Sequence, residues 1–230
     1  MLIASKSLWV AQTNCWVVAA GPGQECVIVD IPPEPQVALD LVREHDLRVA
    51  AVIATHGHID HVGGIGEAVR DSNPQAPVHI HGDDRHMLVD PIGASGGLGQ
   101  MLEQSGLDTR PPEVIEGLDH GDVVSGAGLK FRSIHTPGHT RGSVCLLLEV
   151  EGEAPVLFSG DHLFKGSIGR TDLPGGSFEQ LMQSMEERIL PLDDVVRVLP
   201  GHGEVTTIGE ERRTNPFLAQ FAGATPYRQG

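Results

Sequence analysis

Short apolar runs alternate along the chain with segments of helical periodicity. In the first half, β-rich or continuous apolar stretches predict strands over residues 8–20, 25–30, 49–54 and 77–80. Gly21-Pro22-Gly23 separates the first two strands and predicts a hairpin between them. Apolar side chains at helical spacing predict a helix over residues 37–45, and a second helix is expected after Gly63-Gly64.

The second half repeats this organisation. Strands are predicted over residues 129–134, 143–150, 155–158 and 195–199, and helices over 177–190 and 210–213. Ser177 and Gln180 have the spacing of a capping box at the start of the longer helix. The glycine-rich residues 90–106 predict a mobile loop that could cover a site. Because no linker-like composition divides the halves, one domain over residues 1–230 is expected.

Composition and charge narrow the function classes. With 40% hydrophobic and 20% charged residues, the chain has the composition of a soluble globular protein. Sixteen Lys and Arg against 31 Asp and Glu give a net charge of -15, which argues against nucleic acid as a partner. No apolar run is long enough to span a membrane, and no signal peptide is recognisable at the start. Three widely spaced cysteines suit a reducing compartment, so a cytoplasmic location is expected.

A dense group of metal-ligand residues follows the buried run at residues 49–54. The segment THGHIDH, residues 55–61, contains His56, His58, Asp60 and His61. Imidazole together with carboxylate suits zinc, iron or manganese better than magnesium or calcium, and zinc is the first expectation. A single histidine here would have an ordinary structural explanation. Four ligand-type residues within six positions predict a metal site.

His56 and His58 can reach one ion, while Asp60 and His61 turn toward another. Four ligands do not complete the coordination of two ions, so further ligands are expected downstream at the ends of strands. His139, Asp161 and His202 each follow a predicted strand. Each also lies beside glycines that allow close approach of the backbone. In this order they extend the candidate set to seven.

These segments resemble the metallo-β-lactamase superfamily, and within it the single-domain bacterial type II glyoxalases (hydroxyacylglutathione hydrolases). The metal motif is common to the superfamily. The similarity to the glyoxalase II branch rests on narrower segments, namely Gly-Arg-Thr-Asp at residues 169–172 and Asn-Pro-Phe-Leu at residues 215–218. The resemblance implies an α+β fold, a four-layer αβ/βα sandwich with a dinuclear metal site along one edge.

The resemblance also implies roles for individual residues. One divalent ion would take His56, His58 and His139, the other Asp60, His61 and His202, with Asp161 bridging both. Asp30 stands where the family often keeps a carboxylate that orients a ligand, although it could equally cap a strand end. A hydroxide between the two metals would attack a small-molecule thioester such as S-D-lactoylglutathione, oriented by Asp60. Arg170 is expected at the substrate pocket with Lys165 sharing its role, unless Arg170 is tied structurally to Asp172.

Several alternatives stay open at this point. A persulfide dioxygenase of the same fold would use one iron held by His56, His139 and Asp161. The thiol carrier could be glutathione, another low-molecular-weight thiol or coenzyme A, because little sequence follows His202 to build the helical domain of two-domain relatives. Arg141 replaces the proline usual in relatives, and the roles of His135 and His162 are undecided, as is the oligomeric state. A third metal site among His79, His81 and His86 is less favoured than packing or surface positions.

Overall fold

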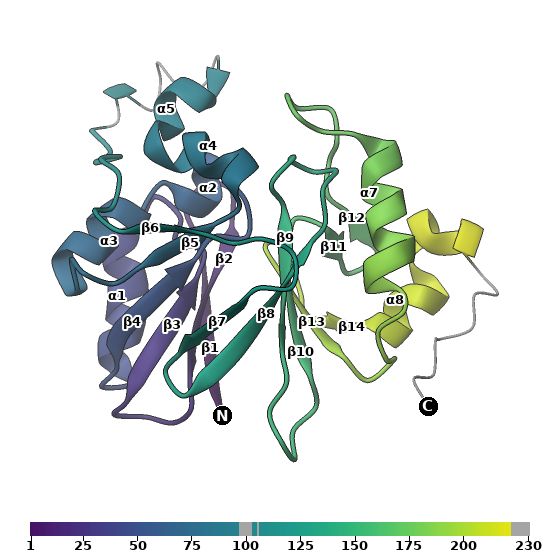
Figure 1. The fold of residues 1–230 in the computed structure, drawn as a ribbon, viewed down its shortest axis with the longest axis horizontal. Helices are drawn as coiled ribbons and strands as arrows, with labels where there is room; N and C mark the ends of the chain where they lie inside the picture. The colour runs from purple at the N-terminus through teal and green to yellow at the C-terminus, as the bar shows by residue number, and fades with distance from the viewer. Residues whose placement is uncertain (97–102, 105, 222–230) are drawn as a thin grey trace.

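The computed structural model describes residues 1–96, 103–104 and 106–221 (Figure 1). Among these residues the strands form two six-stranded sheets and a two-stranded ribbon. The first sheet has the order β1 (Leu2–Leu8), β2 (Thr13–Ala19), β3 (Glu25–Val29), β4 (Arg48–Ile53), β5 (Val78–Ile80) and β6 (Ile115–Gly117). The second has the order β14 (Thr206–Thr207), β13 (Arg197–Pro200), β10 (Val156–Gly160), β9 (Val144–Leu148), β8 (Leu129–His135) and β7 (Val123–Gly126). The ribbon pairs β11 (Leu163–Phe164) with β12 (Ser167–Ile168).

Strand direction changes within each sheet. The first sheet is antiparallel from β1 to β3 and parallel from β3 to β6. In the second sheet, β10 pairs in parallel with β13, and the strands from β10 through β9 and β8 to β7 are antiparallel. Because β3, β4 and β5 run parallel to one another, their carboxyl ends lie at one edge of the sheet. Ligand-bearing loops leave from this edge.

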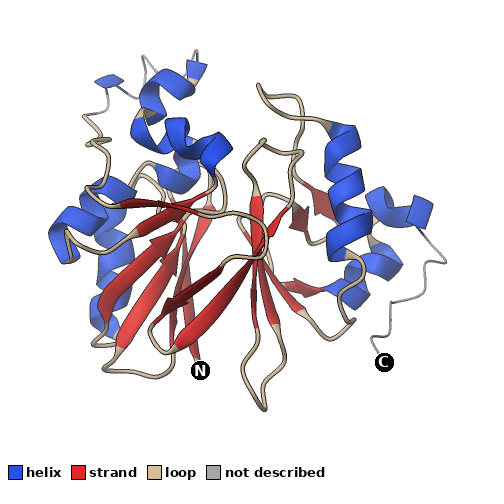
Figure 2. Ribbon diagram, in the orientation of Figure 1, coloured by secondary structure: helices blue, strands red, loops and turns tan. Residues whose placement is uncertain are grey.

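Helices cover the outer face of each sheet (Figure 2). The first half contributes α1 (Pro35–Glu44), α2 (Ile59–Val62), α3 (Ile65–Ser72), the 3₁₀ turn η1 (Gly82–Asp84), α4 (Arg85–Val89) and α5 (Pro91–Ala94). The second half contributes α7 (Phe178–Ser184), the π-helical turn η3 (Met185–Ile189), α8 (Ile208–Thr214) and η4 (Pro216–Phe221). The sheets face each other between these helices, as Figure 1 shows. The predicted four-layer αβ/βα sandwich is confirmed.

The alternation of side chains along β2 explains how one strand serves two cores. Cys15 and Val17 point into the core between the first sheet and its helices. Trp16 and Val18 point into the core between the two sheets. Successive side chains of a strand face opposite sides, so a strand buried on both faces is apolar throughout instead of alternating with polar residues. A third core lies between the second sheet and the α7 and α8 side.

Some predicted elements differ in extent. The single strand predicted over residues 8–20 is wrong, because β1 ends at Leu8 and β2 begins at Thr13. Trp9 and Gln12 between them adopt positive φ angles of 60° and 56°, and the Gln12 amide donates to the Trp9 carbonyl at 3.1 Å. This closes a turn that hydropathy alone does not reveal. The helix predicted over residues 177–190 forms as α7 followed by a π-helical turn, and Ser177 accepts a hydrogen bond from the Gln180 amide as predicted.

The glycine-rich loop predicted over residues 90–106 falls partly outside the described residues. Its described start forms α5, whose first turn is capped by the Asp90 side chain accepting from the Gly93 amide. All three cysteines are buried and free. None of the helices that the structure describes is long and apolar enough to cross a bilayer.

Candidate metal centre

The segment after β4 places four candidate ligands in one tight turn. His56 lies in the loop that follows the strand, and His58 precedes the first turn of α2, which carries Asp60 and His61. The Ile31 amide donates to the His61 carbonyl at 2.8 Å, fixing this turn against the loop after β3. The turn that carries these four side chains is therefore anchored at the carboxyl edge of the first sheet.

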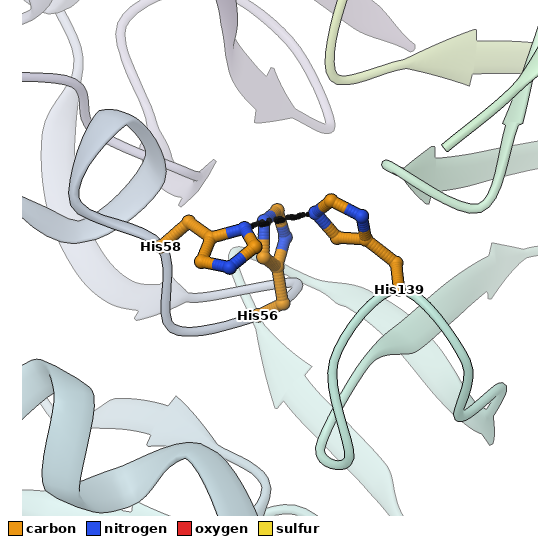
Figure 3. A group of neighbouring side chains, drawn as sticks. All are labelled: His56, His58 and His139. Atoms are coloured by element: carbon orange, nitrogen blue, oxygen red, sulfur yellow. Dashed lines mark hydrogen bonds between the residues drawn. The ribbon is translucent and has the colours of Figure 1, made fainter. Parts of the chain in front are cut away.

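His56, His58 and His139 form a three-histidine group whose nitrogens converge (Figure 3). His58 Nδ1 lies 2.9 Å from His139 Nε2 and 3.1 Å from His56 Nε2. His56 Nε2 and His139 Nε2 are 3.2 Å apart. Ligand nitrogens in a tetrahedral zinc site, with metal–nitrogen distances near 2.0 Å, stand about 3.3 Å apart. The three-histidine group is therefore spaced as ligands of one ion.

Asp60, His61 and His202 form a second ligand group beside the first. Asp60 Oδ2 lies 3.3 Å from His202 Nε2 and 3.5 Å from His61 Nε2. Asp161 lies between the two groups, because its Oδ1 is 3.3 Å from His61 Nε2 and its Oδ2 is 3.5 Å from His139 Nε2. The structure thus brings together all seven candidate ligands, with the Asp161 carboxylate positioned to reach both groups.

The outward-facing ring nitrogens of four histidines are engaged by fixed partners. His61 Nδ1 faces Asp30 Oδ2 at 2.8 Å, and His56 Nδ1 faces Thr55 Oγ1 at 3.1 Å. His139 Nδ1 donates to the Arg170 carbonyl at 2.7 Å, and His202 Nδ1 donates to the Ala11 carbonyl at 3.1 Å. Such partners fix the tautomer and leave the Nε2 lone pair for a metal.

Asp30 connects two of these rings. Its Oδ2 accepts from Thr55 Oγ1 at 2.7 Å as well as from His61 Nδ1, and its Oδ1 accepts from the Thr55 amide at 2.8 Å. The residue adopts a positive φ of 58° and is almost fully buried. Asp30 therefore orients His61 directly and His56 through the Thr55 hydroxyl, which is more than a cap at a strand end.

Burial and neighbouring charges shift the histidine pKa values of the two ligand groups in opposite directions. Burial lowers the pKa of His58 to about 4, with His139 adding to the shift, and burial likewise holds the pKa of His56 well below its usual value. Burial also disfavours the charged form of His61, but Asp161, Asp60 and Asp30 outweigh it and hold the His61 pKa well above its usual value. His56 and His58 are therefore neutral, the form that binds metal.

The donor set fits divalent transition metals. Converging imidazole nitrogens and carboxylates suit zinc, iron or manganese. Asp161 Oδ1 is buried without a hydrogen-bond partner among the described residues, which is costly for a carboxylate unless a cation compensates it. The residues present therefore fit divalent metal ions, which either the three-histidine group or Asp60, His61 and His202 could hold.

Arg170 and Lys165 lie near this centre, but each is paired with an acidic side chain. Arg170 Nε and Nη2 donate to the two oxygens of Asp172 at 2.8 Å each. Lys165 forms an ion pair with Glu204, and both of these side chains are exposed. Phe164, one residue before Lys165, packs edge-on against the His202 ring with centroids 5.9 Å apart. The β11–β12 ribbon thus carries Lys165 beside the second ligand group.

The remaining histidines do not join the centre. His81 stacks on His135 with ring centroids 4.0 Å apart and nearly parallel planes, so their in-plane lone pairs do not converge. Asp83 completes a looser group with this pair, in which its Oδ2 is 3.9 Å from His81 Nδ1 and its side chain is exposed. His79 is buried near Glu116, and His86 is exposed. His162 is buried beside the bridging position without a hydrogen-bond partner among the described residues.

Three further residues support the ligand groups, although no motif in the sequence assigned them a role in the site. Thr13 Oγ1 donates to Asp60 Oδ2 at 3.0 Å, and Asn14 Nδ2 donates to the carbonyls of Pro200 and Gly203 at 3.0 Å each. Asp84 is a buried carboxylate hydrogen-bonded to loops on both sides of the three-histidine group. Thr13, Asn14 and Asp84 all lie outside the ligand motifs, so no local pattern marks them.

Comparisons with known proteins identify the family of this chain. The family model described as the metallo-beta-lactamase superfamily matches residues 8–202. The hydroxyacylglutathione hydrolase GloC of Haemophilus influenzae is 34% identical over 209 residues, which cover 90% of this chain and 93% of that protein.

Two crystal structures resemble most of the chain. BLEG-1 B3 metallo-beta-lactamase superimposes with a TM-score of 0.81 at 35% identity, covering 95% of this chain and 100% of the other. TTHA1623 in a di-iron-bound form superimposes with a TM-score of 0.77 at 35% identity, again covering 95% of this chain and 100% of the other.

Proposed function

This chain belongs to the metallo-β-lactamase superfamily, and from that membership we propose that it hydrolyses the thioester of a small thiol by means of two divalent metal ions. Membership makes it a metal-dependent enzyme of the metallo-hydrolase kind. The observation that carries the proposal is the convergence of seven ligand side chains in two adjoining groups with Asp161 between them. The similarity to a hydroxyacylglutathione hydrolase supports a thioester as substrate.

In this proposal each ligand group holds one ion. His56, His58 and His139 would hold the first, Asp60, His61 and His202 the second, and Asp161 would serve both. Two bound ions supply a Lewis acid for the thioester carbonyl and a water acidified enough to act as nucleophile near neutral pH. Zinc is the expected metal, with iron and manganese as alternatives, and a relative of this fold is known in a di-iron-bound form.

The chain's own residues would then orient the reaction. Asp60 is fixed by Thr13 Oγ1 at 3.0 Å, so its carboxylate can accept a hydrogen bond from the attacking water in one orientation. Ser, Cys or Lys nucleophiles are not needed, and a thiolate leaving group requires little acid assistance. The buried pair of Asp30 and Thr55 holds His61 and His56 so that the ligand set stays fixed during turnover.

Metal content combined with an assay of S-D-lactoylglutathione hydrolysis tests the proposal. We expect two ions per chain and release of free thiol. Asp161→Ala should lower occupancy of both ions, whereas His202→Ala should chiefly lower one. A wild-type chain that saturates with one iron and consumes oxygen with a persulfide substrate would instead make it a persulfide dioxygenase. Parallel assays with lactoyl thioesters of glutathione and coenzyme A identify the carrier.

The place of Arg170 in substrate binding needs a separate test, because its guanidinium is paired with Asp172. If Arg170 binds an anionic group of the substrate, Arg170→Ala should raise KM roughly tenfold or more with little change in kcat, as expected when uniform binding is lost. Asp172→Asn releases the guanidinium and should lower KM. An unchanged KM together with a lowered melting temperature would assign Arg170 to structure alone.

A further inference from the structure

Asp84 is a buried carboxylate that joins the two loops bearing the three-histidine group. Its side chain is about 1% exposed. Its Oδ2 accepts from the Gly57 amide at 2.9 Å and from Thr140 Oγ1 at 2.6 Å, and its Oδ1 accepts from the Gly142 amide at 2.9 Å. Both carboxylate oxygens are therefore used by loops that are more than 80 residues apart in the sequence.

These hydrogen bonds lie beside one ligand group. Gly57 is the residue between His56 and His58, and Thr140 directly follows His139. Among the described residues, the Asp84 side chain has no hydrogen bond to Asp60, His61 or His202. The carboxylate thus links the loop of His56 and His58 to the loop of His139.

The backbones of Gly57 and Gly142 pack closely against the segment that contains Asp84. A Cβ atom added to Gly142 would lie 2.7 Å from Asp84 Cγ and 2.8 Å from the Asp84 amide nitrogen. A Cβ atom added to Gly57 would lie 2.6 Å from Met87 Cβ. Both backbones approach the turn of Asp84 this closely because neither carries a side chain. Thr140 is held in turn by Ser143, whose Oγ lies 2.7 Å from Thr140 Oγ1.

We propose that Asp84 is a positioning residue that keeps His56, His58 and His139 preorganised for the first ion, complementing Asp30, which acts mainly on His61. The inference rests on the proposed two-ion function. Three nitrogens 2.9–3.2 Å apart repel one another when their lone pairs converge, so the chain must hold them together before an ion binds. A buried carboxylate accepting from both loops supplies this restraint.

An amide cannot replace this carboxylate. The Gly57 and Gly142 amides can only donate, and they address different oxygens of Asp84. Asparagine offers one acceptor and one donor group, so in either orientation one backbone N–H faces an NH₂ group. Asp84→Asn therefore keeps the side-chain volume but breaks the link to one loop. Thr140→Val removes the hydroxyl and its hydrogen bonds to Asp84 Oδ2 and Ser143 Oγ, and keeps both backbone amides that donate to Asp84.

Metal affinity measured by competition with a chromophoric chelator, with Zn²⁺ as the probe, tests this inference. Asp84→Asn should weaken one of the two ions about 10- to 100-fold, the range seen when a partner of a metal ligand is lost, and leave the other nearly unchanged. In a His202→Ala background, where the remaining tight ion is that of the three-histidine group, Asp84→Asn should weaken this ion by the same factor. Asp83→Asn is the matched control, because the neighbouring Asp83 is exposed and, among the described residues, its side chain has no hydrogen bond to either loop.

Three outcomes would overturn the inference: unchanged affinity, equal weakening of both ions, or no effect in the His202→Ala background. Near-UV circular dichroism of the metal-free variants verifies that they fold. If Asp84→Asn does not fold, Thr140→Val decides, with an expected loss of roughly fivefold for one ion and an unchanged second ion. Because Zn²⁺ binding is read without turnover, a wild type that binds two ions but hydrolyses no thioester would refute the proposed function and leave this test valid.

Discussion

Asp60 has the contacts expected of a group that both binds metal and orients a reactant. Its Oδ2 lies 3.0 Å from Thr13 Oγ1 and 3.3 Å from His202 Nε2. Burial works against its charged form, but His61 and His202 outweigh burial and lower the Asp60 pKa to about 2. The carboxylate is therefore ionised at neutral pH and can act as an acceptor.

We expect Asp60→Asn to reduce kcat for thioester hydrolysis by about a hundredfold or more, the scale of losing a positioned catalytic group. Asparagine keeps one oxygen acceptor but replaces the other with a donor, so the orientation of the reactant is lost while the fold remains. Steady-state kinetics alongside metal analysis check this. Wild-type turnover with unchanged metal content would remove Asp60 from the mechanism.

His162 is a buried imidazole that makes the stability of the folded chain depend on pH. Burial lowers its pKa to about 3, with His139 adding to the shift, and neither ring nitrogen has a hydrogen-bond partner among the described residues. An unfolded histidine titrates near pH 6.5. As pH falls below this value, the unfolded chain takes up a proton that the folded chain does not, so stability present above about pH 6.5 is lost on acidification.

In the metal-free protein, His162→Leu should therefore flatten the pH dependence of stability. Between pH 7.5 and 5.5 the variant should lose about 1.4 kcal/mol less unfolding free energy than the wild type, the cost of protonating one unfolded histidine. Urea denaturation in the presence of a chelator at both pH values measures this. His86→Gln, which replaces an exposed histidine, should keep the wild-type difference. An identical slope in His162→Leu would contradict the assignment.

At the scale of elements, α8 anchors the ribbon that borders the second ligand group. Glu211 is buried, and its Oε2 accepts from the Gly166 amide and from Asn215 Nδ2 at 2.8 Å each. Its Oε1 accepts from Thr206 Oγ1 at 2.6 Å. Asn215 Nδ2 also donates to the Ser167 carbonyl at 3.0 Å. The segment that resembles the glyoxalase II branch therefore fixes the turn carrying Lys165.

Glu211→Ala should destabilise the protein by roughly 2–4 kcal/mol, because it removes the acceptor of three hydrogen bonds, two of which are buried. It should also raise KM if the ribbon contacts the substrate. Chemical denaturation and steady-state kinetics provide the two readouts. Glu210→Ala on the exposed side of the same helix serves as control and should change stability by well under 1 kcal/mol. Similar effects of both substitutions would argue against the anchor.

Across the whole molecule, the two ligand groups connect the halves of the sandwich. His56 and His58 follow β4 of the first sheet, and His139 follows β8 of the second. The second group likewise draws Asp60 and His61 from one half and His202 from the other. Ions bound between the sheets are thus expected to stabilise the folded state by linking its two layers.

Removal of metal should therefore lower the melting temperature. A ligand present at a hundredfold its Kd contributes about 2.7 kcal/mol, which corresponds to roughly 5–10 °C for a chain of this length. Calorimetry with and without a chelator measures the difference. Asp161→Ala should show a smaller difference than the wild type. Equal melting temperatures for the metal-loaded and metal-free wild type would show that the ions do not brace the sandwich.

Local hydrophobic patterns predict several of the strands and helices that the structure contains. The apolar runs at residues 49–54 and 143–150 appear as β4 and β9, because a strand buried on both faces must be apolar throughout. The helix at residues 37–45 appears as α1 (Pro35–Glu44), since helical spacing of apolar residues is set by one buried face. β1 is only partly buried and the strands of the β11–β12 ribbon are two residues long each, so neither leaves a periodicity to detect.

The residues that offer metal ligands could be identified without a structure, because THGHIDH places four donors in one turn at the end of a buried strand. How those donors combine depends on the packing of the two sheets. The separation of His56 Nε2 from His139 Nε2, and the contacts of Asp84, depend on how two sheets pack across residues distant in the chain. Periodicity records which face of an element is buried, whereas the partner that this face meets is fixed by packing alone.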